Sequence, residues 1–399
     1  MKKSSKLVAL AMALLMAATM LAACGGGTSS EAPASEPASS EAAASGESTT
    51  GESASSVEGA YIGKVPITLK HDVHGNDAKW AEQYAAEKYG ATYEVIDPDQ
   101  DLSKEIAAVE TFISKGVDGI ILHPVTEDGV NEIIQEVRDQ DINIMTYCVG
   151  TTGKQVPSLM IDEAGMAYQM GADMAKQWME LYPDKPVSVG IVGWTDIAFC
   201  FDNRGGPFIN GVKSVTTPDT SANPSPAVFQ NSAGEELTGA TYWVHGGGVL
   251  ETAQQVTADA IAQYPDVNVI YGTNVSNGLG ALAAYEAAGR GKAEDGKPLT
   301  EIIASTDASA GELRKLADPT SSLKYALGMQ PQTFAYAQID MIMELINGTL
   351  DNDTYVERTT PDIYFNYYKD SLETMQDWYN VQYNPETPLD LAAEIANAQ

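Results

Sequence analysis

The residues best suited to chemistry in this sequence are its four histidines and the acidic side chains near them. His71, Asp72 and His74 lie within four residues of one another, and His123 stands directly before Pro124. Such side chains can bind a metal ion or transfer protons, so a metal site and an enzymatic acid–base pair are two hypotheses. However, His71 and His74 lack a recognised metal-ligand spacing with the other histidines. The sequence also has no Gly-x-Ser-x-Gly elbow, no phosphate loop ending in Lys-Ser or Lys-Thr, and no helical His pair. We therefore predict no enzyme, no metal and no cofactor.

A second set of candidates consists of aromatic residues near the ends of expected strands, namely Trp194, Phe199, Phe201 and Trp243. Aromatic faces pack on the C–H surfaces of a sugar ring, while planar polar side chains exchange hydrogen bonds with its hydroxyl groups. We place these four residues in loops that follow strands, which is an unusual position for core residues. At least one of them is predicted to contact a ligand, with ordinary packing as the alternative for each.

Apolar strand-like runs alternate with helical patterns along most of the chain. In its first half the pattern predicts strands at 66–69, 92–96, 117–122, 142–147 and 158–161, with helices at 77–89 and 102–114. The runs 119–122 and 142–145 are almost entirely apolar, as is typical of parallel strands covered by helices on both faces. This strand–helix–strand repetition predicts the α/β class, with doubly wound parallel sheets.

A second series of elements begins after residue 162, and the chain is longer than a single core usually accommodates, so we predict two lobes. The expected strands are 187–192, 242–244, 267–271 and 302–305, with helices at 163–181, 249–263 and 276–288. Residues 214–240 and 289–298 are predicted to be surface loops. Met166, Met170, Met174 and Trp178 recur every four residues, which favours one helical face packed on a sheet over a hydrophobic ligand site.

The first residues predict the compartment. Lys2, Lys3 and Lys6 precede an apolar or small-residue run over 7–23, which indicates a signal peptide. Residues 21–25, Leu-Ala-Ala-Cys-Gly, resemble the bacterial lipobox, so we expect residues 1–23 to be removed and Cys24 to carry lipid. A plain secretory signal and an uncleaved membrane helix are the alternatives. Residues 24–60 are rich in Ser, Glu and Ala, and we predict a disordered tether.

Charge and cysteine content exclude several partners. The chain has 55 acidic and 23 basic residues, for a net charge of −32. Such a surface argues against nucleic acid or anionic lipid as a partner and says little about a neutral ligand. Cys148 and Cys200 are the only cysteines after Cys24, so no disulfide framework is expected.

Several segments resemble the type I periplasmic binding proteins of the ribose and galactose group. They are 105–124, 249–274, 278–289 and the Thr306-Asp307 pair, and the resemblance extends over about 65–367. It implies two Rossmann-like lobes joined by three crossings near Asp162, Gln330 and Asp362. Lobe 1 would combine 61–162 with 331–361, and lobe 2 would combine 163–330 with 362–399. The ligand would lie between the carboxyl ends of both sheets, and the lobes would close by a hinge motion.

The same resemblance implies ligand-binding residues in lobe 2. Arg204 matches the family's clamp arginine, whose five donors can fork onto neighbouring ligand oxygens; a solvent-facing arginine is the alternative. Asn274 and Asp307 end successive strands where the family places a ligand-binding amide and carboxylate, although helix capping is an alternative for both. A hinge glutamine is expected at Gln330 or Gln332.

In lobe 1 the resemblance implies a ligand loop containing His71, Asp72 and His74, with His123 ending a later strand. The sequence departs from the family at Cys148, which stands with Val149 where sugar-binding relatives carry Asp-Arg, and at Val275, which replaces an Asp. These departures leave the identity of the ligand open. Cys148 and Cys200 would approach the cleft from opposite lobes. We favour two reduced, partly buried thiols, with a disulfide between them as the alternative.

Taken with the lipobox, the resemblance implies a monomeric, lipid-anchored receptor outside the cytoplasmic membrane that passes a small polar solute to the permease of an ABC importer. A sugar is the favoured solute, and a nucleoside or sugar acid is an alternative. A sensory module for a membrane receptor is an alternative function. A DNA-binding repressor shares this fold, but it needs a basic helix-turn-helix that this sequence lacks. The stretch 364–399 exceeds the usual family end and is predicted to pack across lobe 2.

Overall fold

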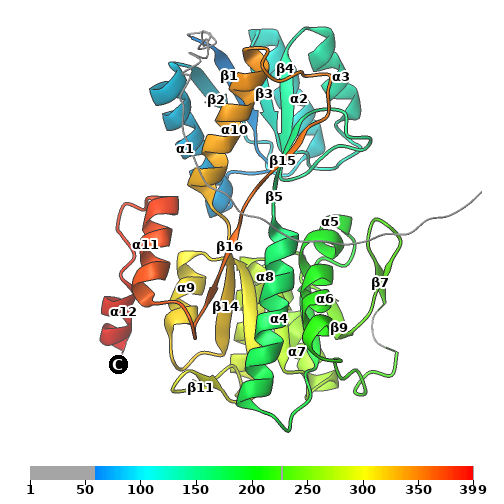
Figure 1. The fold of residues 1–399 in the computed structure, drawn as a ribbon, viewed down its shortest axis with the longest axis vertical. Helices are drawn as coiled ribbons and strands as arrows, with labels where there is room; N and C mark the ends of the chain where they lie inside the picture. The colour runs from blue at the N-terminus through cyan, green and yellow to red at the C-terminus, as the bar shows by residue number, and fades with distance from the viewer. Residues whose placement is uncertain (1–58, 226–227, 399) are drawn as a thin grey trace, which may run out of the picture. The chain divides into compact units, whose positions relative to one another are not determined.

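The computed structural model describes residues 59–225 and 228–398. The predicted signal peptide, Cys24 and nearly all of the tether lie outside the described residues, so those predictions stay untested. Two six-stranded sheets, each flanked by helices, form the framework of the described chain (Figure 1). Among the described helices, none has the length and apolar character needed to cross a membrane.

The first sheet is entirely parallel, with the strand order β15-β5-β4-β3-β1-β2. Its strands are β1 (Tyr61–Val65), β2 (Thr92–Val95), β3 (Gly119–Leu122), β4 (Asn143–Tyr147), β5 (Ser158–Ile161) and β15 (Glu357–Thr360). Its helices are α1 (Asp72–Tyr89), α2 (Leu102–Lys115), α3 (Asn131–Asp139) and α10 (Pro331–Ile346). The predicted first strand at 66–69 is wrong, because β1 precedes it. The charged Lys64 within Tyr61–Val65 hid the apolar pattern of this strand.

Alternation along the strands explains why both faces of this sheet are covered. Successive side chains of a strand point to opposite faces. In β3, Ile120 and Leu122 pack with residues of α2 and α3, whereas Ile121 packs with residues of α1 and α10. A strand whose two faces are both buried needs apolar residues at successive positions. The apolar run at 119–122 therefore predicted a parallel strand correctly.

The second sheet has the order β16-β14-β13-β10-β6-β9 and is parallel except for the antiparallel edge strand β16. Its strands are β6 (Val189–Gly193), β9 (Ala240–His245), β10 (Val269–Gly272), β13 (Ile302–Asp307), β14 (Leu323–Gly328) and β16 (Ile363–Asn366). Its helices are α4 (Glu163–Leu181), α6 (Gly206–Val215), α7 (Leu250–Gln263), α8 (Val275–Ala287) and α9 (Ala310–Ala317). The predicted α/β class with parallel sheets is therefore confirmed. The two predicted surface loops contain short ribbons, β7–β8 (Phe229–Gln230, Glu236–Leu237) and β11–β12 (Ala293–Glu294, Lys297–Pro298).

The chain passes from the first sheet to the second after β5, returns after β14, and passes over again between β15 and β16. The residues at these points are Asp162, Gln330 and Asp362. We keep the ranges 61–162 with 331–361 and 163–330 with 362–399 as our proposal for lobe 1 and lobe 2.

The methionine face of α4 packs in the core of the second sheet. Met170, Met174 and Trp178 are fully buried there, which confirms the prediction of core packing over a hydrophobic ligand site. Helices α4 and α6 lie so close that a Cβ built on Gly211 would be 1.9 Å from the backbone oxygen of Tyr168. This close contact fixes α6 against α4.

Gly211→Ala is expected to destabilise the protein by about 1–3 kcal/mol, because backbone atoms on the other helix cannot move aside. Gly311→Ala is the matched control. Gly311 also lies in a helix, but its added Cβ would meet only ordinary contacts at 3.7 Å, so the higher helix propensity of alanine should make that variant neutral or more stable. Urea unfolding of both variants measures the difference, and equal stabilities would contradict this packing.

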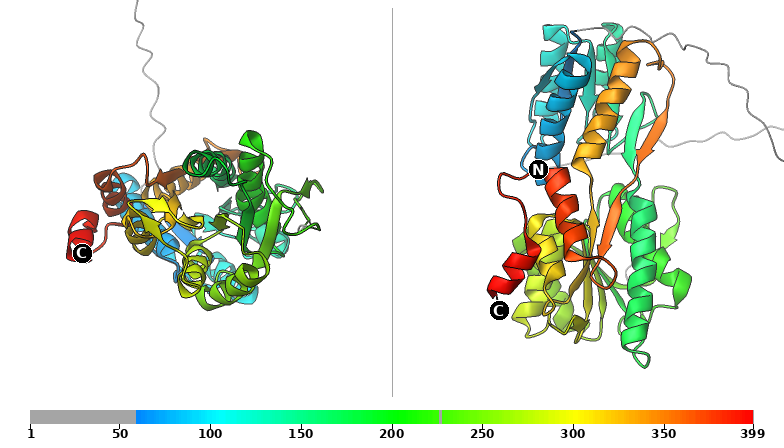
Figure 2. Two further views of the ribbon diagram at one scale, coloured as in Figure 1. Left: turned by 90° about the horizontal axis from the view of Figure 1, so that it is seen from below. Right: turned by 60° about the vertical axis from the view of Figure 1, so that its left-hand side comes forward.

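Two C-terminal helices, α11 (Leu372–Tyr383) and α12 (Leu391–Ala398), complete the described chain. Both contact α9, and their buried residues join a core cluster of the second sheet. Helix α11 also contacts α1 and α10 (Figure 2). The Trp80 indole in α1 donates a hydrogen bond to the Gln382 carbonyl at 2.7 Å. The C-terminal helices thus pack on the side of the second sheet, in agreement with the expected packing across lobe 2, and α11 also contacts elements of proposed lobe 1.

Candidate ligand-binding site

Most of the predicted site residues follow the carboxyl ends of strands, as parallel α/β sheets require of a ligand site. His71 follows β1, His123 follows β3 and Cys148 follows β4. In the second sheet, Trp194 follows β6, Asn274 follows β10, Asp307 ends β13 and Gln330 follows β14. Trp243 differs, because it lies inside β9 rather than in a loop.

Arg204 is the centre of the lobe 2 part of the site. It lies in a π-helical turn, Phe201–Gly205, between the short helix α5 (Ala198–Cys200) and α6. Its Nε and Nη2 donate to the two carboxylate oxygens of Glu163 at 2.6 and 2.9 Å, and its Nη1 donates to the Thr273 carbonyl at 2.7 Å. A guanidinium has five N–H donors, so two remain for a ligand. The solvent-facing alternative is not favoured, since the side chain is only 12% exposed.

Glu163 is a site residue that the sequence reasoning missed. It is the first residue of α4, directly after the crossing at Asp162, and only 2% of it is exposed. Its bidentate contact fixes the plane of the Arg204 guanidinium. An acidic residue in the first turn of a helix is common, because it interacts favourably with the helix dipole. The position of Glu163 in the sequence therefore did not indicate an ion pair with Arg204.

Asn274 uses its side-chain oxygen as a helix cap. Its Oδ1 accepts a hydrogen bond from the Asn277 backbone N–H at 2.8 Å at the start of α8. The structure thus supports helix capping, which was one of the two roles that the sequence allowed for Asn274. Asn274 is 8% exposed, and a contact between its amide group and a ligand stays a prediction.

Asp307 has a constrained position at the end of β13. Its backbone φ is 107° and that of Ala308 is 48°. Its Oδ2 accepts from the Val275 N–H at 3.1 Å, and its carbonyl accepts from the Tyr383 hydroxyl at 3.1 Å. Non-glycine residues held in this region of φ are strained, and such strain concentrates at functional sites.

Burial raises the pKa of Asp307 to about 6, against the opposing effect of Arg204. Because the folded-state pKa lies above the unfolded value, this group supports stability most below about pH 4. That contribution is lost as the pH rises through about 6. Asp307→Asn is therefore expected to remove about 1–2 kcal/mol of the fall in stability between pH 4 and 7. Urea unfolding across this range checks it, and an unchanged pH profile would count against a raised pKa.

The lobe 1 part of the site is a cluster of buried rings. The His74 and His123 rings are 5.1 Å apart between centroids, and the His123 and Tyr147 rings are 5.0 Å apart. Burial lowers the pKa of His123 to about 3 and that of His74 well below its ordinary value, so both imidazoles are neutral near pH 7. His123 Nδ1 and the Tyr147 hydroxyl have no hydrogen-bond partner among the described residues. Buried polar atoms nearly always have partners, so a ligand or water is expected here.

His71 and Asp72 are exposed at the start of α1, and the His71 ring centroid lies 6.1 Å from that of His74. Burial lowers the pKa of His71, and among its charged neighbours Asp72 raises it and Arg204 lowers it further. Arg204 therefore lies within electrostatic range of His71.

A buried ion pair packs against the ring cluster, and it was not predicted from the sequence. Lys64 in β1 forms a salt bridge with Asp77 in α1, and both are at most 1% exposed. Gln338 in α10 accepts from Lys64 at 2.8 Å and donates to Asp77 at 2.8 Å. The Lys64 ammonium lies 4.6 Å from the centroid of the Tyr147 ring. This network fixes the ring next to Cys148, whose backbone φ of 58° marks a second strained strand end.

The four candidate aromatic residues divide into two pairs. Phe201 and Trp243 are buried in a core cluster, with ring centroids 4.7 Å apart. This placement favours core packing for both of them, and Trp243 also supports the Arg204 turn, because a Cβ on Gly205 would lie 2.3 Å from its ring. Trp194 and Phe199 are only partly buried. The Phe199 ring centroid is 5.3 Å from the Arg204 guanidinium carbon, so these two stay as the candidates for stacking.

The remaining predicted site residues are Gln330 and the two cysteines. Gln330 donates from Nε2 to the Pro361 carbonyl at 2.8 Å, which ties the second crossing to the third. Cys148 and Cys200 are free, buried thiols. Burial raises the pKa of Cys200 to about 11 and that of Cys148 well above its ordinary value. Protonated thiols are poor nucleophiles. Within the described ranges, no group of three His, Cys, Asp or Glu residues is arranged to bind a metal ion.

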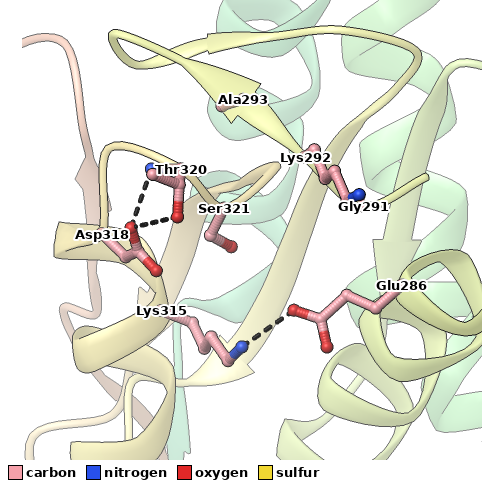
Figure 3. A pocket seen from close by; sticks show the side chains of 8 residues that line it. All are labelled: Glu286, Gly291, Lys292, Ala293, Lys315, Asp318, Thr320 and Ser321. Carbon is pink, nitrogen blue, oxygen red and sulfur yellow. Dashed lines mark hydrogen bonds and ion pairs between the residues drawn. The ribbon is translucent and has the colours of Figure 1, made fainter. Parts of the chain in front are cut away.

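A separate surface pocket lies at the opposite ends of the strands in the second sheet. It is lined by the residues shown in Figure 3, including Glu286, Lys292, Lys315 and Asp318, which precede β13 and β14 or flank the β11–β12 ribbon. Lys315 is paired with Glu286 at 2.8 Å. The pocket is therefore distinct from the cluster around Arg204 and shares no residue with it.

Comparison with known proteins agrees with this architecture. The curated galactofuranose-binding protein YtfQ of Escherichia coli (strain K12) is 29% identical over 85 residues, which cover 20% of this chain and 27% of that protein. The ABC transporter periplasmic-binding protein YphF of the same organism is 22% identical over 262 residues, or 64% of this chain and 71% of the relative.

Solved structures show the same fold. A galactofuranose-binding protein has a TM-score of 0.63 at 16% identity, and the match covers 82% of this chain and 99% of that chain. The binding component of the arabinose ABC transporter from Shewanella sp. ANA-3, bound to α- and β-L-arabinofuranose, has a TM-score of 0.64 at 15% identity, covering 84% and 98%.

A family model described as "Periplasmic binding protein domain" matches residues 62–350, which include both six-stranded sheets except the strands β1 in part, β15 and β16. The match also contains Arg204, Glu163, Asn274 and Asp307. Members of such a family bind solutes and do not transform them, in agreement with the prediction that the chain is not an enzyme. The chain belongs to the periplasmic binding protein domain family.

Proposed function

We propose that this chain is an extracytoplasmic receptor that captures a sugar between its two lobes and delivers it to an ABC importer. The observation that carries the proposal is the arrangement around Arg204. Its guanidinium is held in one plane by Glu163, keeps two free donors, and lies beside the Phe199 ring. A fixed planar donor next to an aromatic face suits neighbouring hydroxyl groups on a ring.

The charges near this site favour a neutral solute over a sugar acid. Arg204 is already neutralised by Glu163, so it brings no net positive charge, and Asp307 adds an acidic group. An anionic ligand would pay for burial beside these carboxylates without a free cation in return. The relatives described as binding galactofuranose or arabinofuranose support a neutral sugar as the class.

The N-terminal sequence supports the location. We infer that Cys24 carries lipid and that residues 25–60 tether the folded part to the outer face of the membrane. Cys24→Ser is the direct test, since it should release the protein from the membrane fraction into the medium without changing its ligand binding.

Deletion of the whole chain should abolish uptake of the labelled ligand if it serves an importer. Intact uptake with a lost transcriptional response to the sugar would instead assign it to sensing.

Thermal unfolding of the chain from residue 25 onward, against neutral monosaccharides, sugar acids, nucleosides and amino acids, tests the ligand class. A ligand at 100 times its dissociation constant adds about 2.7 kcal/mol of stability. We expect a rise in Tm with one or a few neutral monosaccharides. A shift only with nucleosides or anions would retain a receptor and discard the sugar.

A further inference from the structure

The third crossing contains a buried carboxyl group without a partner. Asp362 lies between β15 and β16, and only 7% of it is exposed. Neither carboxylate oxygen has a hydrogen-bond partner among the described residues. A buried carboxylate without hydrogen bonds is unfavourable, and nearly all buried polar atoms in proteins are satisfied. Asp362 therefore needs a donor that the described chain does not supply.

The charged groups around Asp362 show which space it faces. Its pKa is raised well above the ordinary value by burial and then by Glu163, and Asp307 and Asp162 raise it too, while Arg204 lowers it. Glu163 begins α4, Arg204 lies in the turn before α6, and Asp307 ends β13. Sheet pairing gives the same location. Ile363, which follows Asp362, pairs with Gly328 at the carboxyl end of β14, and Thr360 pairs with Ile161 at the carboxyl end of β5. Asp362 therefore lies at the strand ends that carry the candidate ligand site.

Arg204 keeps two N–H donors that no described residue uses. Three of the five N–H groups of Arg204 are already used by Glu163 and Thr273. The carbonyl of the preceding residue, Pro361, accepts a hydrogen bond from Gln330 at 2.8 Å, which fixes the backbone on that side of Asp362. Asp362 and the two unused Arg204 donors belong to the same group of strand ends, and a ligand hydroxyl group could donate to Asp362 and accept from Arg204.

We propose that Asp362 is a ligand-binding residue contributed by the hinge, and that its carboxyl group exchanges hydrogen bonds with hydroxyl groups of the bound sugar. This inference rests on the proposed function and deepens it. Because Asp362 lies in a crossing between the two sheets, a ligand bound to it would act directly on the conformation of the hinge. It also makes Asp362 a specificity residue, since a deoxy sugar lacking the donor would leave the carboxylate unpaired.

Asp362→Asn and Asp362→Ala test the proposal, with Asp162→Asn as the matched control. Asp162 carries the same charge at the first crossing, but it is partnered, because it accepts from the Gly165 N–H at 3.0 Å and caps α4. Each variant is titrated calorimetrically with L-arabinose, D-ribose, D-allose, D-galactose and myo-inositol. For the sugar that binds the wild type best, we expect affinity to fall on the order of 10- to 100-fold in Asp362→Ala and less in Asp362→Asn. The control should change by less than threefold.

Stability in the absence of ligand separates a ligand contact from a structural role. Because folding raises the pKa of Asp362, its contribution to stability is present below about pH 4 and is lost as the pH rises. Asp162, Glu163, Arg204 and Asp307 are the charged groups acting on it. Asp362→Asn should therefore have an equal or higher Tm at pH 7.5 and a flatter pH dependence, while binding more weakly. A lower Tm together with unchanged affinity would show a purely structural role and overturn the proposal.

Monodeoxy analogues of the best sugar identify the contact. Removing the hydroxyl that donates to Asp362 should weaken binding to the wild type but have little further effect in Asp362→Ala. Additive losses for every analogue would also overturn the inference. Failure of the wild type to bind any of the five sugars would instead reject the proposed function, so the two failures are distinguishable.

Discussion

Replacing Arg204 with alanine is expected to weaken sugar binding at least 100-fold and to lower the free energy of unfolding by about 3–5 kcal/mol. The loss of stability follows from Glu163, which is 2% exposed and would be left as an unpaired buried charge. The loss of affinity follows from the two donors that only the guanidinium offers to a ligand. Urea unfolding and calorimetric titration of the same preparation measure both effects.

A second variant separates these two roles of Arg204. The double substitution Arg204→Met with Glu163→Leu removes the ion pair and fills its space with apolar side chains, so most of the lost stability should return. Binding should not return. If the double variant bound sugar as tightly as the wild type, Arg204 would be a structural residue and the clamp interpretation would be wrong.

Deleting residues 371–399 is expected to abolish cooperative folding. The deleted stretch contributes several fully or nearly buried side chains to the core of the second sheet, namely Met375, Tyr379, Tyr383, Leu389 and Leu391. Burial of each side chain is worth about 1.5–3 kcal/mol. Their sum is comparable with the total stability of a typical domain, about 5–15 kcal/mol. Circular dichroism melting of the truncated chain should show no cooperative transition.

Single substitutions in the same helices give a graded control. Leu391 is fully buried, so Leu391→Ala should cost about 2–5 kcal/mol. Val381 in α11 is 54% exposed, and Val381→Ser should change stability by less than about 0.5 kcal/mol. A truncated chain that still melted cooperatively near the wild-type Tm would show that the C-terminal helices are an accessory to the fold.

The framework could be predicted from the sequence because its signals are local. The strand 158–161 and the helix 163–181 were predicted with the bounds that the structure has, since apolar periodicity and a capping aspartate both mark that region. The first strand was missed for a physical reason that sequence does not contain. Lys64 is tolerated there only because Asp77 and Gln338, distant in sequence, satisfy its charge.

The site was harder to predict because its contacts are long-range. Arg204 was identified through its family position, but its partner Glu163 is 41 residues away and carried no signal beyond a helix start. Trp243 was expected in a loop although the predicted strand 242–244 contains it, and the structure places it within β9 and in the core. Asn274 shows a further limit, since an Asn before a helix is typical both of a cap and of a ligand contact, and the structure shows the cap.

Calorimetric titration of the chain from residue 25 onward, with the monosaccharide that raises its Tm most, tests the central claim most directly. We expect one saturable site per chain, with affinity lost in Arg204→Ala and reduced in Asp362→Ala. No saturable binding of any monosaccharide, or binding that both substitutions leave unchanged, would contradict a sugar site at the strand ends around Arg204.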